Sequence, residues 1–282
     1  MAAEGTKIAV LGGRGMLGSD LVRTCRQQGM KPIVYDLPEF DITNEDHLQQ
    51  AVAGADIIVN CAAYTNVDGA ESQAELAYRV NAEAVGRLGA DARKAGKWVL
   101  HISTDFVFDG RGDKPYVETD HPNPINTYGK TKLAGEQLLT GSGCEHCIVR
   151  VQWTYGSAGS NFVTKLIQRA KSQDTLKVVD DQTGSPTSTI EAAKAICELL
   201  RKRPEGIYHF ASAGYVTRYG MARFILEKLS MDVNLQPCKT SDFPSPAARP
   251  LNSRFDCSKI ANLLDEPIER WQDPLELFLR RL

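Results

Sequence analysis

The stretch Lys7-Ile-Ala-Val-Leu-Gly-Gly-Arg-Gly-Met-Leu-Gly18 joins a short apolar run to the first residues of a helical pattern. Such a run is typical of a strand that is buried on both faces of a parallel sheet. Glycines at positions 12, 15 and 18 permit a tight turn, close approach of a pyrophosphate, and close packing of the helix on the sheet. Free N–H groups and the helix dipole favour an anion at this helix N-terminus. The segment therefore predicts a dinucleotide-binding unit rather than a purely structural glycine turn.

Strand and helix signals alternate through the first half of the chain. We expect strands at 7–11, 31–36, 56–60, 98–102 and 147–151, and helices at 16–29, 43–53, 71–96 and 128–140. Thr43 is a plausible N-cap, and Gly29 and Gly96 suit helix ends. The alternation predicts an α/β fold with a doubly wound parallel sheet of the Rossmann type.

The pattern loosens from about Trp153 onward. Helices are expected at 161–172, 190–203, 219–230 and 274–282, and a further strand at 206–211. We therefore predict an NAD(P)-binding Rossmann domain over residues 1–152 and a smaller, mainly substrate-binding lobe over residues 153–282. Residues from about 188 to 214 are expected to return to the first domain.

Composition narrows the class of protein. Hydrophobic residues make up 42% of the 282 residues and charged residues 24%, as in ordinary globular proteins. A net charge of −2 gives no electrostatic reason to expect nucleic acid or a membrane surface as a partner. The first residues carry no signal-peptide pattern, and no apolar stretch is long enough to span a membrane. We expect a cytoplasmic protein.

The cysteines favour reduced thiols. There are seven, scattered and odd in number, which does not suit a disulfide framework. Cys144-Glu-His-Cys147 has the spacing of half a zinc site, but no second pair follows at a suitable distance. We expect no metal and no redox role for this segment.

Two charged residues near the glycine loop bear on the choice of cofactor. Asp36 ends the second strand, 18 residues after Gly18, and would accept hydrogen bonds from ribose hydroxyls, which favours NAD. Arg14 lies inside the loop and would face a 2′-phosphate, which favours NADP. Either residue is equally compatible with a solvated surface charge, so the choice between NADH and NADPH stays open.

Smaller signals follow the third strand. The residues Asn60-Cys-Ala-Ala63 would let the backbone approach a cofactor closely, although a plain turn explains them almost as well. Asn81 is an unusual residue for the interior of a helix. It would either hold a strand-end carbonyl near the cofactor or simply be exposed.

Tyr128 and Lys132 lie four residues apart at the start of a predicted helix, so their side chains project from the same face. A lysine beside a tyrosine stabilises the phenolate and lowers the phenol pKa from about 10. The phenol could then exchange a proton near neutral pH, as carbonyl reduction requires. With 9 tyrosines in the chain such a pair also arises by chance, and an exposed pair is the alternative.

The segment Ser103-Thr-Asp-Phe-Val-Phe-Asp-Gly110 follows the fourth strand, so its hydroxyls emerge at the carboxyl edge of the sheet, where ligands bind. A hydroxyl there can donate to a substrate carbonyl and share a proton network with Tyr128. Alternatively, Ser103 and Thr104 cap a turn.

Taken together, these elements resemble a known family. The 12–18 loop, Asn60-Cys-Ala-Ala63, the 103–110 segment and Tyr128-Gly-Lys-Thr-Lys132 are similar to the extended short-chain dehydrogenase/reductases that act on nucleotide sugars, and among these to the dTDP-4-dehydrorhamnose reductases. Further matches run through nearly the whole chain, at 62–72, 128–136, 153–156, 161–162, 181–187 and 249–254.

The resemblance implies an activity and a catalytic trio. The reaction would be transfer of hydride from NAD(P)H to C4 of a dTDP-linked 4-keto sugar, which yields dTDP-L-rhamnose. Tyr128 would protonate the developing alkoxide. Lys132 would lower the tyrosine pKa and bind the nicotinamide ribose, and Thr104 would hydrogen-bond the carbonyl oxygen.

The resemblance also implies binding residues. Those expected at the cofactor, besides Tyr128 and Lys132, are Gly12, Arg14, Gly15, Met16, Leu17, Gly18, Asp36, Asp41, Ile42, Cys61, Ala62, Ala63 and Asn81. Those expected at the substrate are Thr65, Val67, Thr104, Asp105, Trp153, Asn161, Gln182, Arg249 and Arg254. Trp153 would lie against the sugar ring, its alternative being an ordinary core tryptophan. The arginines would hold the diphosphate, although Arg249 also suits a surface loop.

Two departures limit the transfer of roles. Gln152 stands where a small hydroxyl residue is expected, which leaves the local pocket shape open. Some family members dimerise through a metal held by acidic residues, but the motifs here do not establish such a site. We expect no required metal, and a monomer or a homodimer.

Two other functions fit the same motifs. A non-catalytic, NADP-binding regulatory subunit, like that of methionine adenosyltransferase, has a similar fold and retains related segments. Trp153, the 181–187 segment and the chain length favour the reductase. A different nucleotide-sugar reductase or epimerase would share the trio and differ in the C-terminal lobe.

Overall fold

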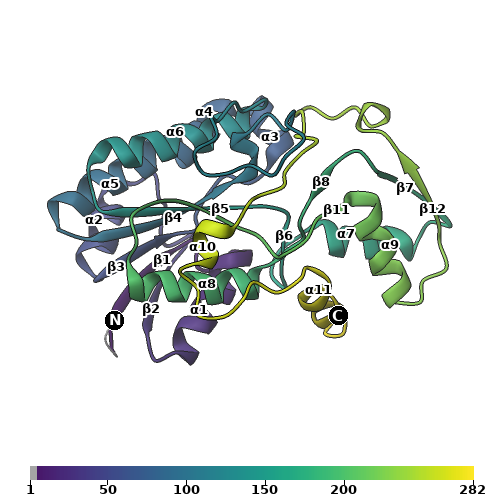
Figure 1. Ribbon diagram of the computed structural model, residues 1–282. Helices are drawn as coiled ribbons and strands as arrows, with labels where there is room; N and C mark the ends of the chain where they lie inside the picture. Colours follow the sequence, from purple (N-terminus) through teal and green to yellow (C-terminus); the bar gives the residue numbers. More distant parts are fainter. Residues whose placement is uncertain (1–4) are drawn as a thin grey trace.

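The computed structural model describes residues 5–282 and shows a parallel sheet between two layers of helices, with a smaller lobe at one end (Figure 1). Residues 1–4, the beginning of the segment expected to lack a signal peptide, lie outside the described residues.

Six parallel strands form the central sheet. They are β1 (Lys7–Leu11), β2 (Lys31–Tyr35), β3 (Ile57–Asn60), β4 (Trp98–Thr104), β5 (His146–Val151) and β10 (Gly206–Phe210). The order is β10-β5-β4-β3-β1-β2, so the direction of winding reverses between β1 and β3. The doubly wound α/β fold is therefore confirmed, and ligands of such sheets bind at the carboxyl ends beside this switch point.

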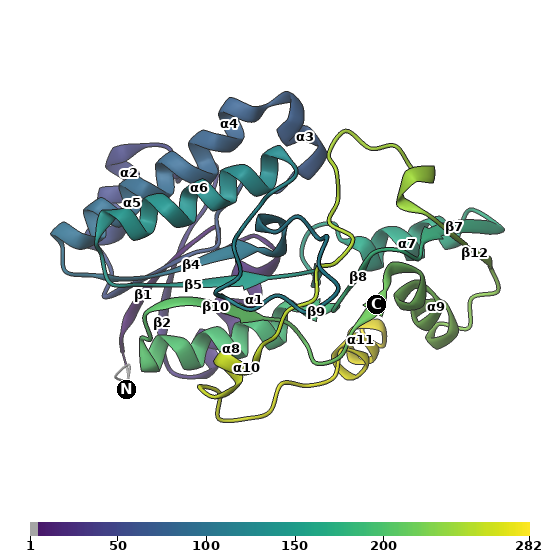
Figure 2. The ribbon, with the colours of Figure 1, turned by 45° about the horizontal axis from the view of Figure 1, so that its top comes forward.

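Helices cover both faces of the sheet. One face carries α1 (Met16–Gln27) and α8 (Thr189–Lys202), and the other carries α2 (Glu45–Ala53), α5 (Ala84–Lys94) and α6 (Thr127–Ser142). Figure 2 shows α5 and α6 side by side over the sheet, with α8 on the opposite face. Side chains alternate between the two faces of a strand. In β1, Ile8 and Val10 therefore pack in the core on one face of the sheet, and Ala9 and Leu11 pack in the core on the other.

The expected helix at 71–96 is broken into several segments. The structure has α3 (Val67–Ser72), α4 (Ala74–Tyr78), a π-helical turn (Arg79–Glu83) and then α5. The π turn contains Asn81, whose buried side chain accepts from Tyr64 N at 2.8 Å and donates to Thr131 Oγ1 at 3.1 Å. The spacing of apolar residues does not predict such a π turn, because the turn depends on hydrogen bonds from Asn81 to a neighbouring segment.

The prediction of Thr43 as N-cap is wrong, because Asn44 caps α2 by accepting from the N–H groups of Asp46 and His47. The Thr43 hydroxyl instead donates to Asp41 Oδ1 at 2.8 Å. Gly29 and Gly96 are confirmed at helix ends, with φ of 75° and 62°.

The smaller lobe has its own apolar core around α7 (Phe162–Ala170), α9 (Arg218–Lys228) and α11 (Gln272–Leu279). A parallel pair of strands, β7 (Thr175–Val179) and β12 (Asn234–Cys238), was not predicted. Short pairs join the lobe to its surroundings: β6 (Thr154–Tyr155) with β9 (Thr187–Ser188), and β8 (Thr183–Gly184) with β11 (Val216–Thr217). The remaining elements are α10 (Ser258–Ala261) and the 3-10 turns Asp105–Val107 and Thr240–Asp242.

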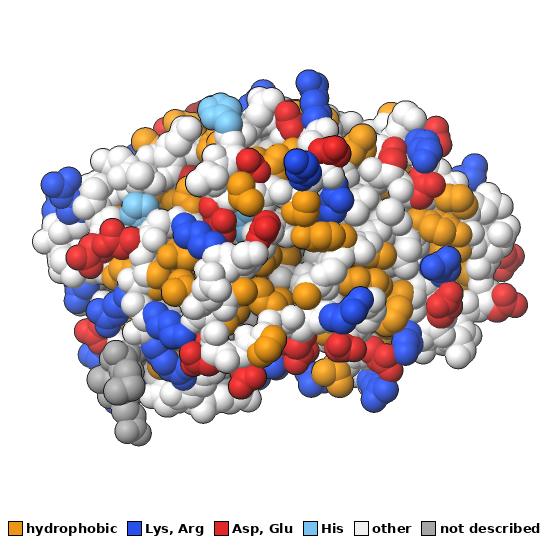
Figure 3. Space-filling view, in the orientation of Figure 1, with side chains coloured by type: hydrophobic (Ala, Val, Ile, Leu, Met, Phe, Trp, Pro, Cys, Tyr) orange, Lys and Arg blue, Asp and Glu red, His pale blue; other side chains and the backbone are white. Residues whose placement is uncertain are grey.

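The surface carries mixed charge. On the face drawn in Figure 3, Lys and Arg side chains are interspersed with Asp and Glu rather than gathered in one broad patch. Within residues 5–282, no helix combines the length and the apolar character needed to cross a membrane.

A buried ion pair fixes α6 to the sheet. Arg150 on β5 donates from Nε to Glu136 Oε1 at 2.9 Å and from Nη2 to Glu136 Oε2 at 2.6 Å. Both side chains are almost fully buried, with exposures of 1% and 3%. Such a paired geometry is needed to offset the cost of burying both charges.

We predict that Glu136→Gln lowers the free energy of unfolding by about 3 kcal/mol, because it leaves a buried guanidinium without its counter-charge. Urea unfolding measures the effect. The matched control is Glu227→Gln, which breaks an exposed pair with Arg223 and should change stability by less than about 1 kcal/mol. If the two substitutions lowered the free energy of unfolding equally, the buried pair would not contribute more to stability than the exposed pair, and the prediction would be wrong.

Candidate active site

A cleft of about 1030 Å³ lies at the carboxyl edge of the sheet and is closed on its far side by residues of the smaller lobe. Most residues predicted for the site line it: Gly12, Arg14, Gly15, Met16, Leu17, Asp36, Asp41, Ile42, Cys61, Ala62, Ala63, Thr65, Val67, Thr104, Asp105, Tyr128, Lys132, Trp153, Asn161, Gln182 and Arg249. Gly18, Asn81 and Arg254 are outside its lining.

The glycine loop fits a bound pyrophosphate. Gly12 has φ of 72°, and a Cβ there would lie 2.7 Å from the backbone N of Ala62. A Cβ at Gly18 would overlap the carbonyl of Gly12, so this glycine serves helix packing rather than the cleft. No side chain caps α1 at Gly15, which leaves its first N–H groups available to an anion. The loop therefore has the shape and the donors that a dinucleotide needs.

Asp36 and Arg14 lie next to each other beside this loop. Asp36 accepts from the backbone N–H of Arg14 at 2.7 Å and of Leu37 at 2.8 Å. The Arg14 guanidinium donates to Glu39 at 2.7 Å and to the carbonyl of Leu37 at 2.8 Å. A carboxylate suited to ribose hydroxyls thus stands beside a cation suited to a 2′-phosphate, and both NADH and NADPH are accommodated by the residues present.

Lys132 is buried beneath the cleft floor, with 2% of its surface exposed. Its Nζ donates to the carbonyl of Ile102 at 2.7 Å and lies 3.3 Å from Nε2 of His101. Burial lowers the pKa of Lys132 to about 8. Burial and the nearby ammonium hold the pKa of His101 well below its usual range, so the lysine faces a neutral ring.

The environment of Tyr128 differs from the sequence expectation. Burial raises the pKa of its phenol to about 12, and a hydrogen bond with Thr104 offsets this only in part. The expected lowering by Lys132 is wrong for this state, because the ammonium is directed to Ile102 and His101. The phenol ring packs edge-on against Phe106, with ring centroids 5.5 Å apart. Asn126 caps the helix by accepting from Gly129 N at 2.8 Å, which places Tyr128 in its first turn.

Thr104 connects the tyrosine to a buried carboxyl. Its hydroxyl donates to Asp105 Oδ1 at 3.0 Å and accepts from Phe106 N at 3.2 Å. Asp105 is 3% exposed and also accepts from Ser253. Burial raises the pKa of Asp105 to about 6, despite these hydrogen bonds. The protonation state of Asp105 therefore decides which way the Thr104 hydroxyl points.

Trp153 has an unexpected partner. It adopts φ of 45°, and the guanidinium of Arg218 lies 3.6 Å from the centroid of its ring. The same guanidinium lies 4.9 Å from the ring of Phe162. One face of Trp153 is therefore covered by a cation. The ring is also approached by Gly184, where a Cβ would lie 2.7 Å from it.

Several predicted substrate residues have local structural partners. Asn161 caps α7, accepting from Thr164 N at 3.1 Å and donating to Gly156 O at 2.9 Å. Gln182 donates to Thr240 Oγ1 at 3.1 Å. Arg254 reaches away from the cleft to Asn252 Oδ1 and to the carbonyl of Asp113.

Sequence reasoning missed several residues of the lining: Phe106, Phe162, Lys165, Val179, Arg218, Pro250 and Ser253. Arg218 is the first residue of α9, where a cation is unfavourable because it opposes the helix dipole. An arginine at the start of a predicted helix could therefore have indicated a binding role. The departure at Gln152 has a structural explanation, since its Oε1 accepts from Ser185 N at 2.9 Å and ties the cleft wall to the neighbouring loop.

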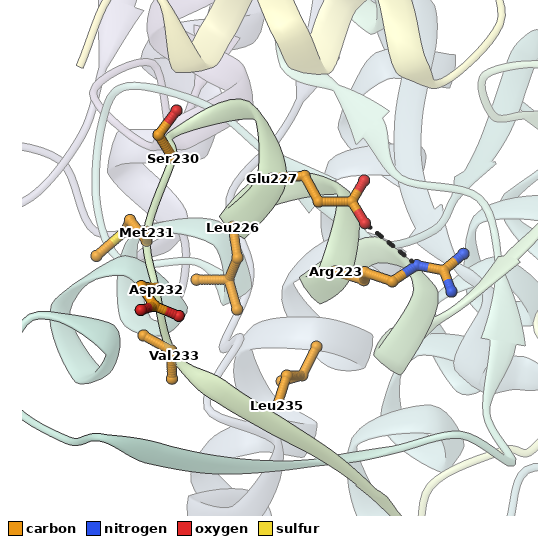
Figure 4. Close-up of a pocket in the computed structure, with 8 residues that line it drawn as sticks. All are labelled: Arg223, Leu226, Glu227, Ser230, Met231, Asp232, Val233 and Leu235. Carbon is orange, nitrogen blue, oxygen red and sulfur yellow. Dashed lines mark ion pairs between the residues drawn. The ribbon is translucent and has the colours of Figure 1, made fainter.

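A second, smaller hollow of about 350 Å³ lies on the outer lobe (Figure 4). Its lining comes from α9 and the following segment: Arg223, Leu226, Glu227, Ser230, Met231, Asp232, Val233 and Leu235. Arg223 and Glu227 already pair with each other at 3.6 Å. None of the predicted site residues belongs to it, so the chemistry is assigned to the larger cleft.

Comparison with known proteins agrees with this assignment. A family model described as "RmlD substrate binding domain" matches residues 6–282. The chain is 34% identical to the dTDP-4-dehydrorhamnose reductase of Mycobacterium tuberculosis strain H37Rv, over 98% of this chain and 93% of that protein. It is 36% identical to the reductase of that name from Salmonella typhimurium, over 94% of each chain.

Solved structures give the same relationship. A dTDP-4-dehydrorhamnose reductase from Clostridium acetobutylicum superposes with a TM-score of 0.93 at 36% identity, covering 98% of this chain and 99% of that one. The Bacillus anthracis reductase, in complex with NADP, gives 0.94 at 34% identity, covering 99% and 100%. The Thermus thermophilus UDP-glucose 4-epimerase, 19% identical with a TM-score of 0.84, shares the fold alone. The chain therefore belongs to the RmlD substrate binding domain family, together with these dTDP-4-dehydrorhamnose reductases.

Proposed function

We propose that the protein reduces the C4 keto group of dTDP-4-dehydro-6-deoxy-L-mannose to dTDP-L-rhamnose with NADPH or NADH. One observation carries the proposal. Tyr128, Thr104 and Lys132 line the same cleft as the glycine loop of β1 and α1, so a proton donor stands in the same space as a dinucleotide site. The family membership supports the substrate.

The reduced cofactor, when bound, supplies the hydride that is added to C4. Tyr128 donates its phenolic proton to the oxygen that becomes negative as C4 is reduced. A raised pKa keeps this phenol protonated at neutral pH, and a secondary alkoxide is more basic than a phenolate, so the transfer remains downhill. Thr104 hydrogen-bonds the phenolate that is left, and Lys132 is held where its remaining N–H groups can reach the nicotinamide ribose.

Charge on the substrate side of the cleft supports an anionic substrate. Lys165, Arg218 and Arg249 line this part, against one acid, Asp105. Among residues 5–282, neither Lys165 nor Arg218 forms an ion pair. A nucleoside diphosphate would supply the missing negative charge.

The expectations on location and assembly belong to the same proposal. We infer a cytoplasmic enzyme that works as a monomer or a homodimer, with no nucleic acid, membrane or required metal as partner. Residues 1–152 would bind the cofactor, with about 188–214 returning to that domain, and residues 153–282 would mainly bind the substrate. The net charge of −2 and the seven scattered cysteines support this view.

Turnover is the first test. With dTDP-4-dehydro-6-deoxy-L-mannose and NADPH or NADH, the absorbance of the reduced cofactor should fall, and Tyr128→Phe should lower kcat by about 100-fold or more, because the proton donor is lost. Cofactor affinity should stay largely intact, as measured by fluorescence titration. The control is Tyr78→Phe, a change at an exposed tyrosine that does not line the cleft. Tight cofactor binding without turnover would favour the non-catalytic regulatory function, and turnover of another nucleotide sugar would favour a related reductase or epimerase.

Cofactor preference is the second test. Asp36→Ala removes a carboxylate that repels a 2′-phosphate, so the ratio of kcat/KM for NADPH to that for NADH should rise by about tenfold. Arg14→Ala should move the ratio in the opposite direction. An unchanged ratio in both variants would contradict the placement of these residues at the adenosine ribose.

The pH dependence is the third test. As pH falls through about 6, Asp105 becomes protonated, and the single proton of the Thr104 hydroxyl is no longer held by a carboxylate. The hydroxyl is then free to donate to the phenolate of Tyr128, so kcat/KM should increase. The measurement uses NADH, which lacks the 2′-phosphate that titrates in the same range. Asp105→Asn should remove this acid limb of the profile. A limb that persists in the variant would assign it to another group.

A further inference from the structure

Among residues 5–282, the Arg218 guanidinium has no polar partner. It lines the cleft between the rings of Trp153 and Phe162, with its Cζ 3.6 Å and 4.9 Å from their centroids. Within the described chain, its side chain forms no hydrogen bond and no ion pair, and only its backbone N–H is engaged, with Gln182 O at 3.1 Å. Asp105 is near enough to favour the charged form but does not pair with it.

Leaving such a charge unpaired is costly. Arg218 is partly buried, and this burial lowers the pKa of its guanidinium to about 9, because the nearby Asp105 offsets the loss of water only in part. The two rings hold the planar group in place and leave its N–H edge unengaged. A preorganised fork of donors of this kind matches a phosphate or carboxylate.

The other two arginines of this region are already engaged. Arg249 makes four hydrogen bonds, to both carboxylate oxygens of Asp68, to Ser245 Oγ and to Ala247 O, at 2.6–2.8 Å. Arg254 lies outside the cleft and bonds to Asn252 and Asp113. The cations that remain for a substrate anion are therefore Arg218 and Lys165, and of these two only Arg218 is held in place between aromatic rings.

We propose that Arg218 is the main residue that binds the diphosphate of the nucleotide-sugar substrate, and that Arg249 chiefly holds the cleft wall through Asp68. This proposal rests on the proposed function and specifies which side chain recognises the anion. Arg218 lies beside Trp153 and near Asp105, so an anion that it binds would lie next to the residues proposed to contact the sugar.

The test is binding of thymidine, dTMP and dTDP to the wild type and to Arg218→Met, by calorimetry. Methionine keeps an unbranched apolar chain against Trp153 and removes the charge. The dTDP affinity should fall by about 10- to 100-fold, and the thymidine affinity should change by less than about twofold. KM for the sugar nucleotide should rise with little change in kcat. Arg218→Lys should retain part of the dTDP affinity, and Arg223→Met on the same helix, outside the cleft, should behave as wild type.

Thermal unfolding separates binding from a structural role. If Arg218 is unpaired in the free protein, Arg218→Met should melt at the same temperature as the wild type or higher, and the rise in Tm caused by dTDP should shrink. A lower Tm with equal losses for thymidine and dTDP would overturn the proposal, as would a loss of NADPH affinity in place of dTDP affinity. If the wild type turns over the sugar nucleotide and Arg218→Met binds dTDP as tightly as the wild type does, the assignment of Arg218 is rejected and the proposed function stands. A wild type that neither turns over the sugar nor binds dTDP would reject the proposed function as well.

Discussion

The seating of helix α6 against the sheet is the constraint on which the candidate site depends. Tyr128, Lys132 and Glu136 follow one another at intervals of four residues, so they form a single stripe facing inward. Tyr128 reaches the cleft, Lys132 donates to the carbonyl of Ile102, and Glu136 pairs with Arg150. The close approach needs glycine, since a Cβ at Gly129 or Gly135 would overlap the carbonyl of Phe106 or Asn81.

Burial of this stripe shapes its chemistry. The same loss of water raises the pKa of Tyr128 to about 12 and lowers the pKa of Lys132 to about 8. Each shift disfavours the charged form, as expected for groups removed from water. At neutral pH the protein therefore holds a protonated phenol and a weakly solvated ammonium at the cleft floor, and both respond to the charge that a cofactor and a substrate bring.

Local patterns predicted the parts of the molecule that depend on short segments. The six strands, the glycine loop and the Tyr128–Lys132 pair were accessible, because apolar runs, glycine spacing and helical periodicity are properties of neighbouring residues. The π turn at Asn81 and the Arg218–Trp153 stack were not, because each joins segments far apart in the sequence. The pKa of Tyr128 was mispredicted for the same reason: spacing shows that Lys132 shares its face, but not that the ammonium turns to Ile102.

The central claim is that one cleft brings hydride transfer at C4 of a nucleotide sugar together with proton donation from Tyr128. The most direct measurement is to supply NADPH deuterated at the transferable position and to locate the label in the product by NMR. We expect deuterium on C4 of a dTDP-linked 6-deoxy sugar, with the hydroxyl proton coming from solvent. Label at any other carbon, or no labelled sugar nucleotide at all, would contradict it.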